Sequence, residues 1–151
     1  METANQLDLA RDIVRKGLFN IEPVTKEIDR DILSLAYTPG VGMTCMEIDK
    51  HHSLADSYTI KERAVAILSD GDLLNCSPKE FMVAMDWFVF QIKEYSGVDA
   101  YPFVVEKKSD LTKIFKNLMN SYCGVVYLDS RTDFSVPEKF LFIRHQDILA
   151  L

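Results

Sequence analysis

The sequence predicts an α/β domain: a small, mostly parallel sheet with flanking helices, preceded by an N-terminal helical segment. From residue 63 onward, three apolar and largely β-branched runs alternate with two helical patterns. This β-α-β-α-β order is typical of parallel strands joined by right-handed helical crossovers. A chain of 151 residues, of which 48% are hydrophobic, has room for one domain with a sizeable core.

Four helical patterns precede the first strand, over residues 3–17, 26–35, 41–48 and 53–58. In the first pattern, Thr3 and Gln6 have capping-box spacing, and apolar residues then recur at the helical period. Between the second and third patterns, Pro39 biases Thr38 away from helical dihedrals, and Gly40 permits a tight turn. We expect this helical segment to pack against the sheet.

Parallel, adjacent strands are predicted over residues 63–68, 98–105 and 124–128, with helices over residues 77–95 and 109–121. Ser77 is expected to cap the first of these helices, followed by a proline at its first position, with Glu80 reaching back to the cap. The helix is apolar nearly all round, which indicates burial on more than one side. Its aromatic cluster of Trp87, Phe88 and Phe90 fits either the core or an interface between subunits.

The charge and the cysteine content of the chain disfavour some classes of function and some cellular compartments. The net charge of −6, the pI near 5.0 and the lack of a Lys/Arg run disfavour nucleic acid as a partner. No apolar run approaches the ~20 residues that cross a bilayer, so membrane insertion is not expected. Cys45, Cys76 and Cys123 are widely spaced and odd in number, which favours reduced thiols and a cytoplasmic or other reducing intracellular compartment.

Five short motifs occur in order along the chain. They are Ser34-Leu-Ala-Tyr37-Thr-Pro-Gly-Val41, Cys45-Met-Glu47-Ile48, Arg63-Ala-Val-Ala-Ile-Leu-Ser-Asp-Gly71, Gly97-Val-Asp-Ala-Tyr-Pro102 and Gly124-Val-Val-Tyr-Leu-Asp129. Together, over residues 33–140, they resemble the N-terminal domain of malic enzymes, which oxidise and decarboxylate malate with a nicotinamide cofactor and a divalent metal. The resemblance implies that Tyr37 is a catalytic acid and that Asp129 is a metal ligand. Because no Rossmann-type unit is found, we expect a single domain over residues 1–151, with no NAD-binding domain and no cofactor.

The sequence departs from the family pattern at the positions that carry the reaction. Phe88 stands where the resemblance places a lysine that transfers a proton, and phenylalanine can neither accept nor donate one. Leu128 stands where the first of two adjacent carboxylates is expected, directly before Asp129. The resemblance also implies a third carboxylate, whose counterpart lies within residues 142–147. A basic residue replaces the aspartate there and would repel a cation.

These departures favour a pseudoenzyme, a non-catalytic chain that acts as a structural or protein-interaction subunit with a protein partner or by self-association. Tyr37 and Asp129 would then be vestigial, the tyrosine packed beside a turn and the carboxylate capping a loop. Two alternatives stay open: binding of malate or a related dicarboxylate near Tyr37, or a half-enzyme completed in trans by a separate nucleotide-binding chain. The protein contact is expected to include one or more of Leu7, Ile13, Trp87 and Phe90.

Overall fold

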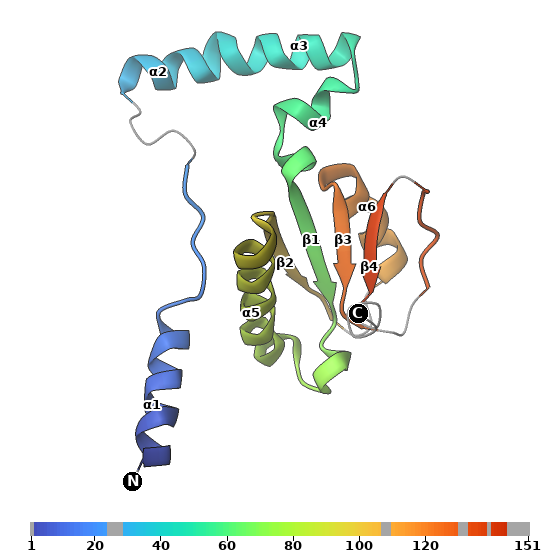
Figure 1. Ribbon diagram of the computed structural model, residues 1–151. Helices are drawn as coiled ribbons and strands as arrows, with labels where there is room; N and C mark the ends of the chain where they lie inside the picture. The colour runs from blue at the N-terminus through green and yellow to red at the C-terminus, as the bar shows by residue number, and fades with distance from the viewer. Residues whose placement is uncertain (1, 24–28, 107–109, 130–132, 139, 145–151) are drawn as a thin grey trace.

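The computed structural model describes residues 2–23, 29–106, 110–129, 133–138 and 140–144. Its centre is a sheet of four parallel strands in the order β2-β1-β3-β4 (Figure 1). The strands are β1 (Ala64–Ser69), β2 (Asp99–Val104), β3 (Gly124–Tyr127) and β4 (Leu141–Arg144). The predicted fold class is confirmed, and so are the three predicted strands and their parallel pairing.

The fourth strand, β4, is not among the predicted ones. It pairs with β3, with Gly124 opposite Leu141 and Tyr127 opposite Arg144. Glycine is needed at this pairing, because a Cβ on Gly124 would lie 2.9 Å from the Leu141 carbonyl oxygen. The run has 4 residues and ends in a charged one, so it gives a weaker strand signal than the 6 residues of β1.

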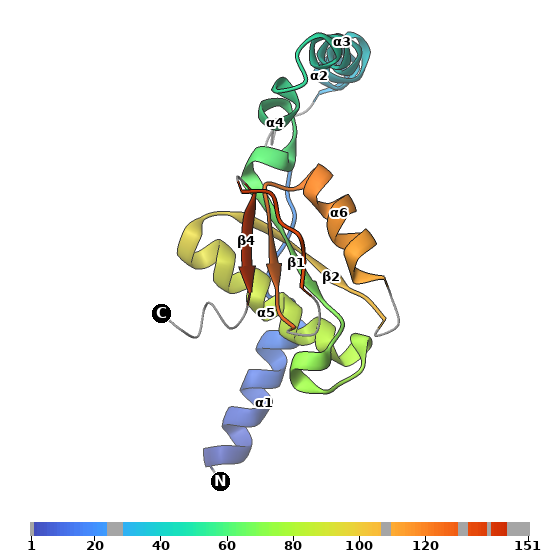
Figure 2. The ribbon, with the colours of Figure 1, turned by 90° about the vertical axis from the view of Figure 1, so that its right-hand side faces the viewer.

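Two helices cover opposite faces of the sheet (Figure 2). They are α5 (Pro78–Ser96), after β1, and α6 (Leu111–Ser121), after β2. The predicted cap of α5 is present: the Ser77 amide donates to the Glu80 carboxylate over 2.8 Å, and the Ser77 hydroxyl accepts from the Glu80 amide. Gly97, at φ 72°, ends the helix in a left-handed conformation that glycine adopts without steric cost.

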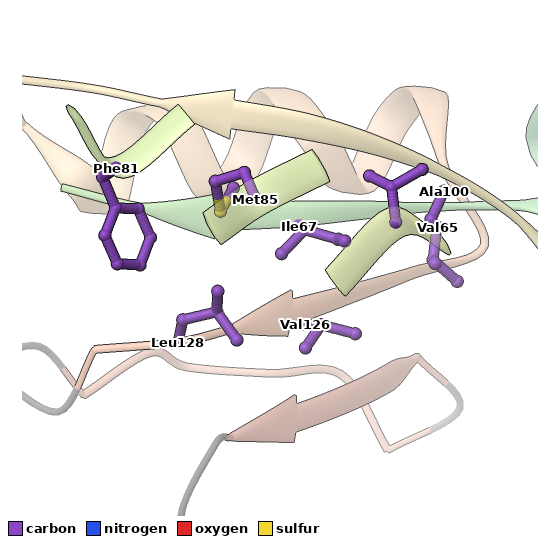
Figure 3. Packing of buried hydrophobic residues seen from close by; sticks show 8 residues of the cluster. Val65, Ile67, Phe81, Met85, Ala100, Val126 and Leu128 are labelled. Carbon is purple, nitrogen blue, oxygen red and sulfur yellow. The ribbon is translucent and has the colours of Figure 1, made fainter. Parts of the chain in front are cut away.

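Apolar side chains of the strands alternate between two buried clusters, one on each face of the sheet. Beneath α5 the cluster contains Val65, Ile67, Phe81, Met85, Val89, Ala100, Val126 and Leu128 (Figure 3). Beneath α6 it contains Ala66, Leu68, Leu111, Phe115, Leu118, Val125, Tyr127 and Phe134. Because both faces are covered, the strands are continuous apolar runs rather than alternating ones. We call the four strands with α5 and α6 the α/β unit.

Among the described residues, the N-terminal helices make no extensive contact with the sheet, which corrects the prediction. Phe19, which follows the first helix, does pack against the cluster beneath α5. Its elements are α1 (Glu2–Arg15), α2 (Arg30–Leu35), a π-helical turn η1 (Ala36–Val41), α3 (Gly42–Lys50) and α4 (Leu54–Tyr58). Residues 26–28 of the predicted second helix lie outside the described residues. We call Arg30–Lys50 the arm. In both views it stands clear of the sheet and reaches β1 through α4 and the short turn Ile60–Arg63 (Figures 1 and 2).

Local sequence explains the shape of the arm. Asp29 caps α2, where its Oδ1 accepts from the Ile32 amide over 2.8 Å. At Thr38 the backbone is extended, with φ −138° and ψ 113°, as predicted for a residue before proline. Gly40 is required in the same turn, because a Cβ there would lie 2.8 Å from the Leu35 carbonyl oxygen. The arm is therefore two helices joined at a kink.

Candidate functional site

The two predicted site residues, Tyr37 and Asp129, lie in separate parts of the molecule. Tyr37 lies in η1 on the arm and is 77% exposed. Asp129 follows β3 and is 3% exposed. The arm stands beyond the edge of the sheet where β1 begins, whereas Asp129 follows the edge where the strands end (Figure 1). A single chain does not bring these two side chains into a common site.

Asp129 holds the loop that follows β1. Its Oδ2 accepts from the Asp70 amide over 2.8 Å, and its Oδ1 accepts from the Leu73 amide over 2.9 Å. Burial raises the pKa of the Asp129 carboxyl, and the hydrogen bond from the Leu73 backbone opposes that shift. Both oxygens thus join the ends of β1 and β3, which is the arrangement of a residue that caps a loop.

The Ser-Asp-Gly motif at the end of β1, residues 69–71, stabilises the loop that follows β1 through hydrogen bonds of its own. The Gly71 amide donates to Ser69 Oγ over 3.0 Å, and the Asp72 amide donates to Asp70 Oδ1 over 3.1 Å. Gly71 has φ 83°, and a Cβ there would lie 2.8 Å from the Cys76 carbonyl oxygen. Glycine is therefore required at this position by the turn itself.

The residues at this strand end do not fit a divalent cation. Leu128, where the resemblance implies a second carboxylate, is 1% exposed and belongs to the core cluster beneath α5. Among the described residues, no group of three or more His, Cys, Asp or Glu side chains is arranged to hold a metal ion. The counterpart of the third carboxylate, beyond Arg144, lies outside the described residues. A hard cation needs several converging oxygens, and each Asp129 oxygen accepts a hydrogen bond from the loop.

An apolar groove lies between α5 and the part of the sheet formed by β3 and β4, with a volume of about 670 Å³. It is lined by Val65, Phe88, Gln91, Ile92, Tyr95, Ser96, Val98, Val126, Leu141 and Ile143. None of these described lining residues carries a formal charge at pH 7. Phe88, at the position that the resemblance assigns to the lysine, is one of them. The place of the expected proton-transferring group is thus a largely apolar surface.

Sequence reasoning did not find this groove, because one of its walls comes from the unpredicted strand β4. Leu141 and Ile143 of β4 face it together with Val126 of β3. The available signal was the apolar run that starts at Phe140, which is too short to distinguish a strand from a loop.

The outer side of α5 carries a second apolar surface. The side chains that α5 buries against the sheet are Phe81, Met85 and Val89. Phe88 packs against the same core cluster. Trp87 is 48% exposed and stacks on Phe90 with ring centroids 5.5 Å apart. Of the aromatic cluster, Phe88 therefore fits the core interpretation, whereas Trp87 does not.

Three known proteins that are similar to this chain are all malic enzymes. The NAD-dependent malic enzyme of Geobacillus stearothermophilus is 33% identical over 117 residues, which cover 74% of this chain and 24% of that relative. The bifunctional malic/malolactic enzyme of Bacillus subtilis is 31% identical over 115 residues, which cover 72% of this chain and 27% of that relative. The crystal structure of the NAD-dependent malic enzyme of Thermotoga maritima superimposes with a TM-score of 0.72 at 27% identity, over 82% of this chain and 36% of that one. No family model matches the chain.

The parallel sheet with a helix on each of its faces forms an α/β domain, and this fold matches part of the solved malic enzyme structures. The chain is a malic enzyme-related domain. It spans about a quarter of the length of the two relatives described above. In the described part of the chain, no helix combines the length and apolar character that crossing a bilayer requires.

Proposed function

We propose that this domain, residues 1–151, is a non-catalytic subunit that acts by binding protein, either a second copy or another polypeptide. The observation that carries the proposal is the groove beside α5. It holds Phe88 at the position that the resemblance assigns to the proton-transferring lysine, and its described lining is uncharged. Oxidation of a hydroxy acid such as malate needs a group that accepts the hydroxyl proton. Phenylalanine supplies none.

Exposed apolar side chains support a role in protein contact. Leu7 and Ile13 of α1 are 67% and 54% exposed, and Trp87 of α5 is nearly half exposed. With the groove, they give the chain more apolar surface than its own described elements cover. Apolar surface of this extent favours association.

A turnover assay tests the proposal. The purified chain, incubated with malate, NAD or NADP, and Mg²⁺ or Mn²⁺, should form no reduced cofactor above a buffer blank. The malic enzyme of Geobacillus stearothermophilus, assayed in parallel, serves as the active control. Turnover that disappears in Tyr37→Phe but persists in Tyr58→Phe, an exposed tyrosine outside the groove, would overturn the proposal.

A half-enzyme completed in trans is the second candidate, and the similarity to malic enzymes over about a quarter of their length favours it. A separate nucleotide-binding chain would then supply the cofactor site and the missing proton-transferring group. To test this candidate, the chain is mixed with native extract fractions that show no malate turnover alone. Turnover in the mixture would favour the half-enzyme. Binding of malate or a related dicarboxylate near Tyr37 would instead appear as a one-to-one calorimetric isotherm that Tyr37→Ala abolishes.

The cysteines support a location for the subunit. Cys45, Cys76 and Cys123 are free thiols. Free thiols persist in reducing compartments. We therefore place the protein in the cytoplasm or another reducing intracellular compartment, which localisation of a tagged chain would test.

A further inference from the structure

The groove beside α5 is open among the described residues. On this face of the sheet, α5 lies chiefly over β2 and leaves β3 and β4 largely bare (Figure 1). Leu141 of β4 and Tyr95 of α5, which both line the groove, are 48% and 83% exposed. All-parallel sheets normally have both faces covered. The β3–β4 half of this face therefore needs a cover that α5 does not supply.

On the opposite face, the chain itself covers the same strands. Phe134, from the loop between β3 and β4, is 8% exposed and stacks on Phe115 of α6 with ring centroids 4.3 Å apart. Phe142 of β4 lies edge-on to Phe115, with ring centroids 5.2 Å apart. The two faces of β4 therefore differ. Phe142 packs against the cluster beneath α6, whereas Leu141 and Ile143 face the groove.

The lining of the groove favours an uncharged, apolar occupant. Its described residues carry no formal charge, and the three with polar side-chain atoms are Gln91, Tyr95 and Ser96. The Ser96 hydroxyl already donates to the Ile92 carbonyl and accepts from the Val98 amide. A charged group placed in this groove would lose its hydration without gaining a partner of opposite charge.

We infer that residues 148–151 of this chain fill the groove. They belong to the seven residues that follow β4, His145-Gln-Asp-Ile-Leu-Ala-Leu151, which lie outside the described residues. This stretch divides into three polar residues and then four apolar ones, Ile148-Leu-Ala-Leu151. The polar residues suit an exposed turn, and the four apolar residues match the uncharged lining.

Position and reach favour this segment over a separate partner. It follows β4 directly, and Ile143 of β4 is part of the groove wall. The stretch of α5 that lines the groove, from Phe88 to Ser96, is about 12 Å long at about 1.5 Å per residue. Seven extended residues span up to about 23 Å, so they can turn at the end of β4 and run back along it. A segment joined to the groove wall by a short turn has an effective concentration of roughly millimolar, which favours it over a free partner of similar composition.

This inference goes beyond the proposed function, because it concerns the groove when no partner is bound. Residues 148–151 compete with any partner that would bind the same apolar surface, so the contact is autoinhibitory. The groove opens only when the segment leaves it. The apolar surfaces of α1, of Trp87 and of the arm stay available in either state.

A disulfide cross-link in the full chain tests the position of the segment. Mild oxidation of the chain with Gln91→Cys and Leu149→Cys should give an intramolecular bond between positions 91 and 149, identified by peptide mass. Glu94→Cys with Leu149→Cys is the matched control, because Glu94 is exposed within one turn of Gln91 but does not line the groove. We expect the control pair to form its bond at least about tenfold more slowly, because its effective concentration is lower. Absence of the 91–149 bond, equal rates for the two pairs, or a 91–149 bond between two copies would overturn the inference.

Thiol labelling tests whether the segment covers the groove. In Gln91→Cys, the new thiol should react about tenfold or more faster with a maleimide once Leu149→Asp and Leu151→Asp are added, because carboxylates do not enter an apolar groove. Gln146→Asp is the matched control, since it adds a carboxylate to the polar turn and should leave the rate unchanged. Circular dichroism checks that each variant folds. A labelling rate that the double substitution does not change, or that Gln146→Asp raises equally, would overturn the inference. Malate turnover would contradict the proposed function but would leave both of these readouts unchanged.

Discussion

The α/β unit and the arm differ in where their apolar side chains go. In the unit, the apolar residues of the strands and of the inner helix faces fill two clusters that the chain itself encloses. In the arm, residues of the same kind stay exposed, such as Leu35 and Met46. One region is therefore stabilised within the chain, whereas the exposed apolar side chains of the other are available to the protein partner of the proposed function. The comparison shows that an apolar pattern predicts burial without naming the surface that provides it.

Truncation of apolar side chains should show the largest difference between the two regions. Phe81→Ala should lower the free energy of unfolding by about 3–5 kcal/mol, because Phe81 is fully buried beneath α5. Leu35→Ala should change it by less than about 1 kcal/mol, because Leu35 is exposed in the single chain. Urea denaturation followed by circular dichroism measures both values. Equal losses at the two positions would remove the distinction between the regions.

Most of the α/β unit could be predicted because its signals are local. The capping box at Ser77 and the apolar run of β1 specify their elements without knowledge of the rest of the fold. The helices of the arm are specified in the same way, and α3 begins at Gly42, one residue after the predicted start. The packing of this segment against the sheet was predicted wrongly, because an amphipathic pattern does not identify its partner. β4 was missed because 4 residues give too short a pattern.

The candidate site was harder to predict because its geometry depends on contacts between distant segments. Asp129 could be placed after a strand, but its bonds to the Asp70 and Leu73 amides join residues more than fifty positions apart. Phe88 could be placed on a helix, whereas the apolar groove around it requires β4 as a wall. The roles of Tyr37 and Asp129 stay predictions that the assays above address.

Removal of the Asp129 carboxylate should cause the second-largest loss in the free energy of unfolding. The substitution changes contacts within the α/β unit and none in the arm. Asp129→Ala should lower the free energy of unfolding by about 2–4 kcal/mol, because it leaves two amides at the end of β1 without their acceptor. Asp133→Ala is the control, since this side chain is 90% exposed and pairs with Arg144 at the surface, and it should cost less than about 1 kcal/mol. If the two substitutions cost the same, Asp129 does not hold the loop.

The cap of α5 should give a smaller, pH-dependent effect. Hydrogen bonds from Ser77 lower the pKa of Glu80 below its ordinary value of 4.5. The stability that the ionised carboxylate contributes is present above that ordinary value and is lost as pH falls through the lowered one. Ser77→Ala should cost about 1 kcal/mol at pH 7 and reduce this acid dependence. Thermal melts from pH 7 to pH 3 measure it, and an unchanged acid dependence in Ser77→Ala would contradict the assignment.

Amide hydrogen exchange at several protein concentrations tests the central claim most directly. Amides of β1 and β3 should be protected at every concentration, because their hydrogen bonds lie inside the α/β unit. Amides of α2 and α3 should exchange rapidly in dilute solution and become protected as the chain associates. A chain with Val41→Glu and Met43→Glu, which place charges on the apolar arm, should show rapid exchange in the arm throughout. Arm amides whose exchange does not depend on concentration, whether fast or slow, would contradict the claim that self-association protects the arm.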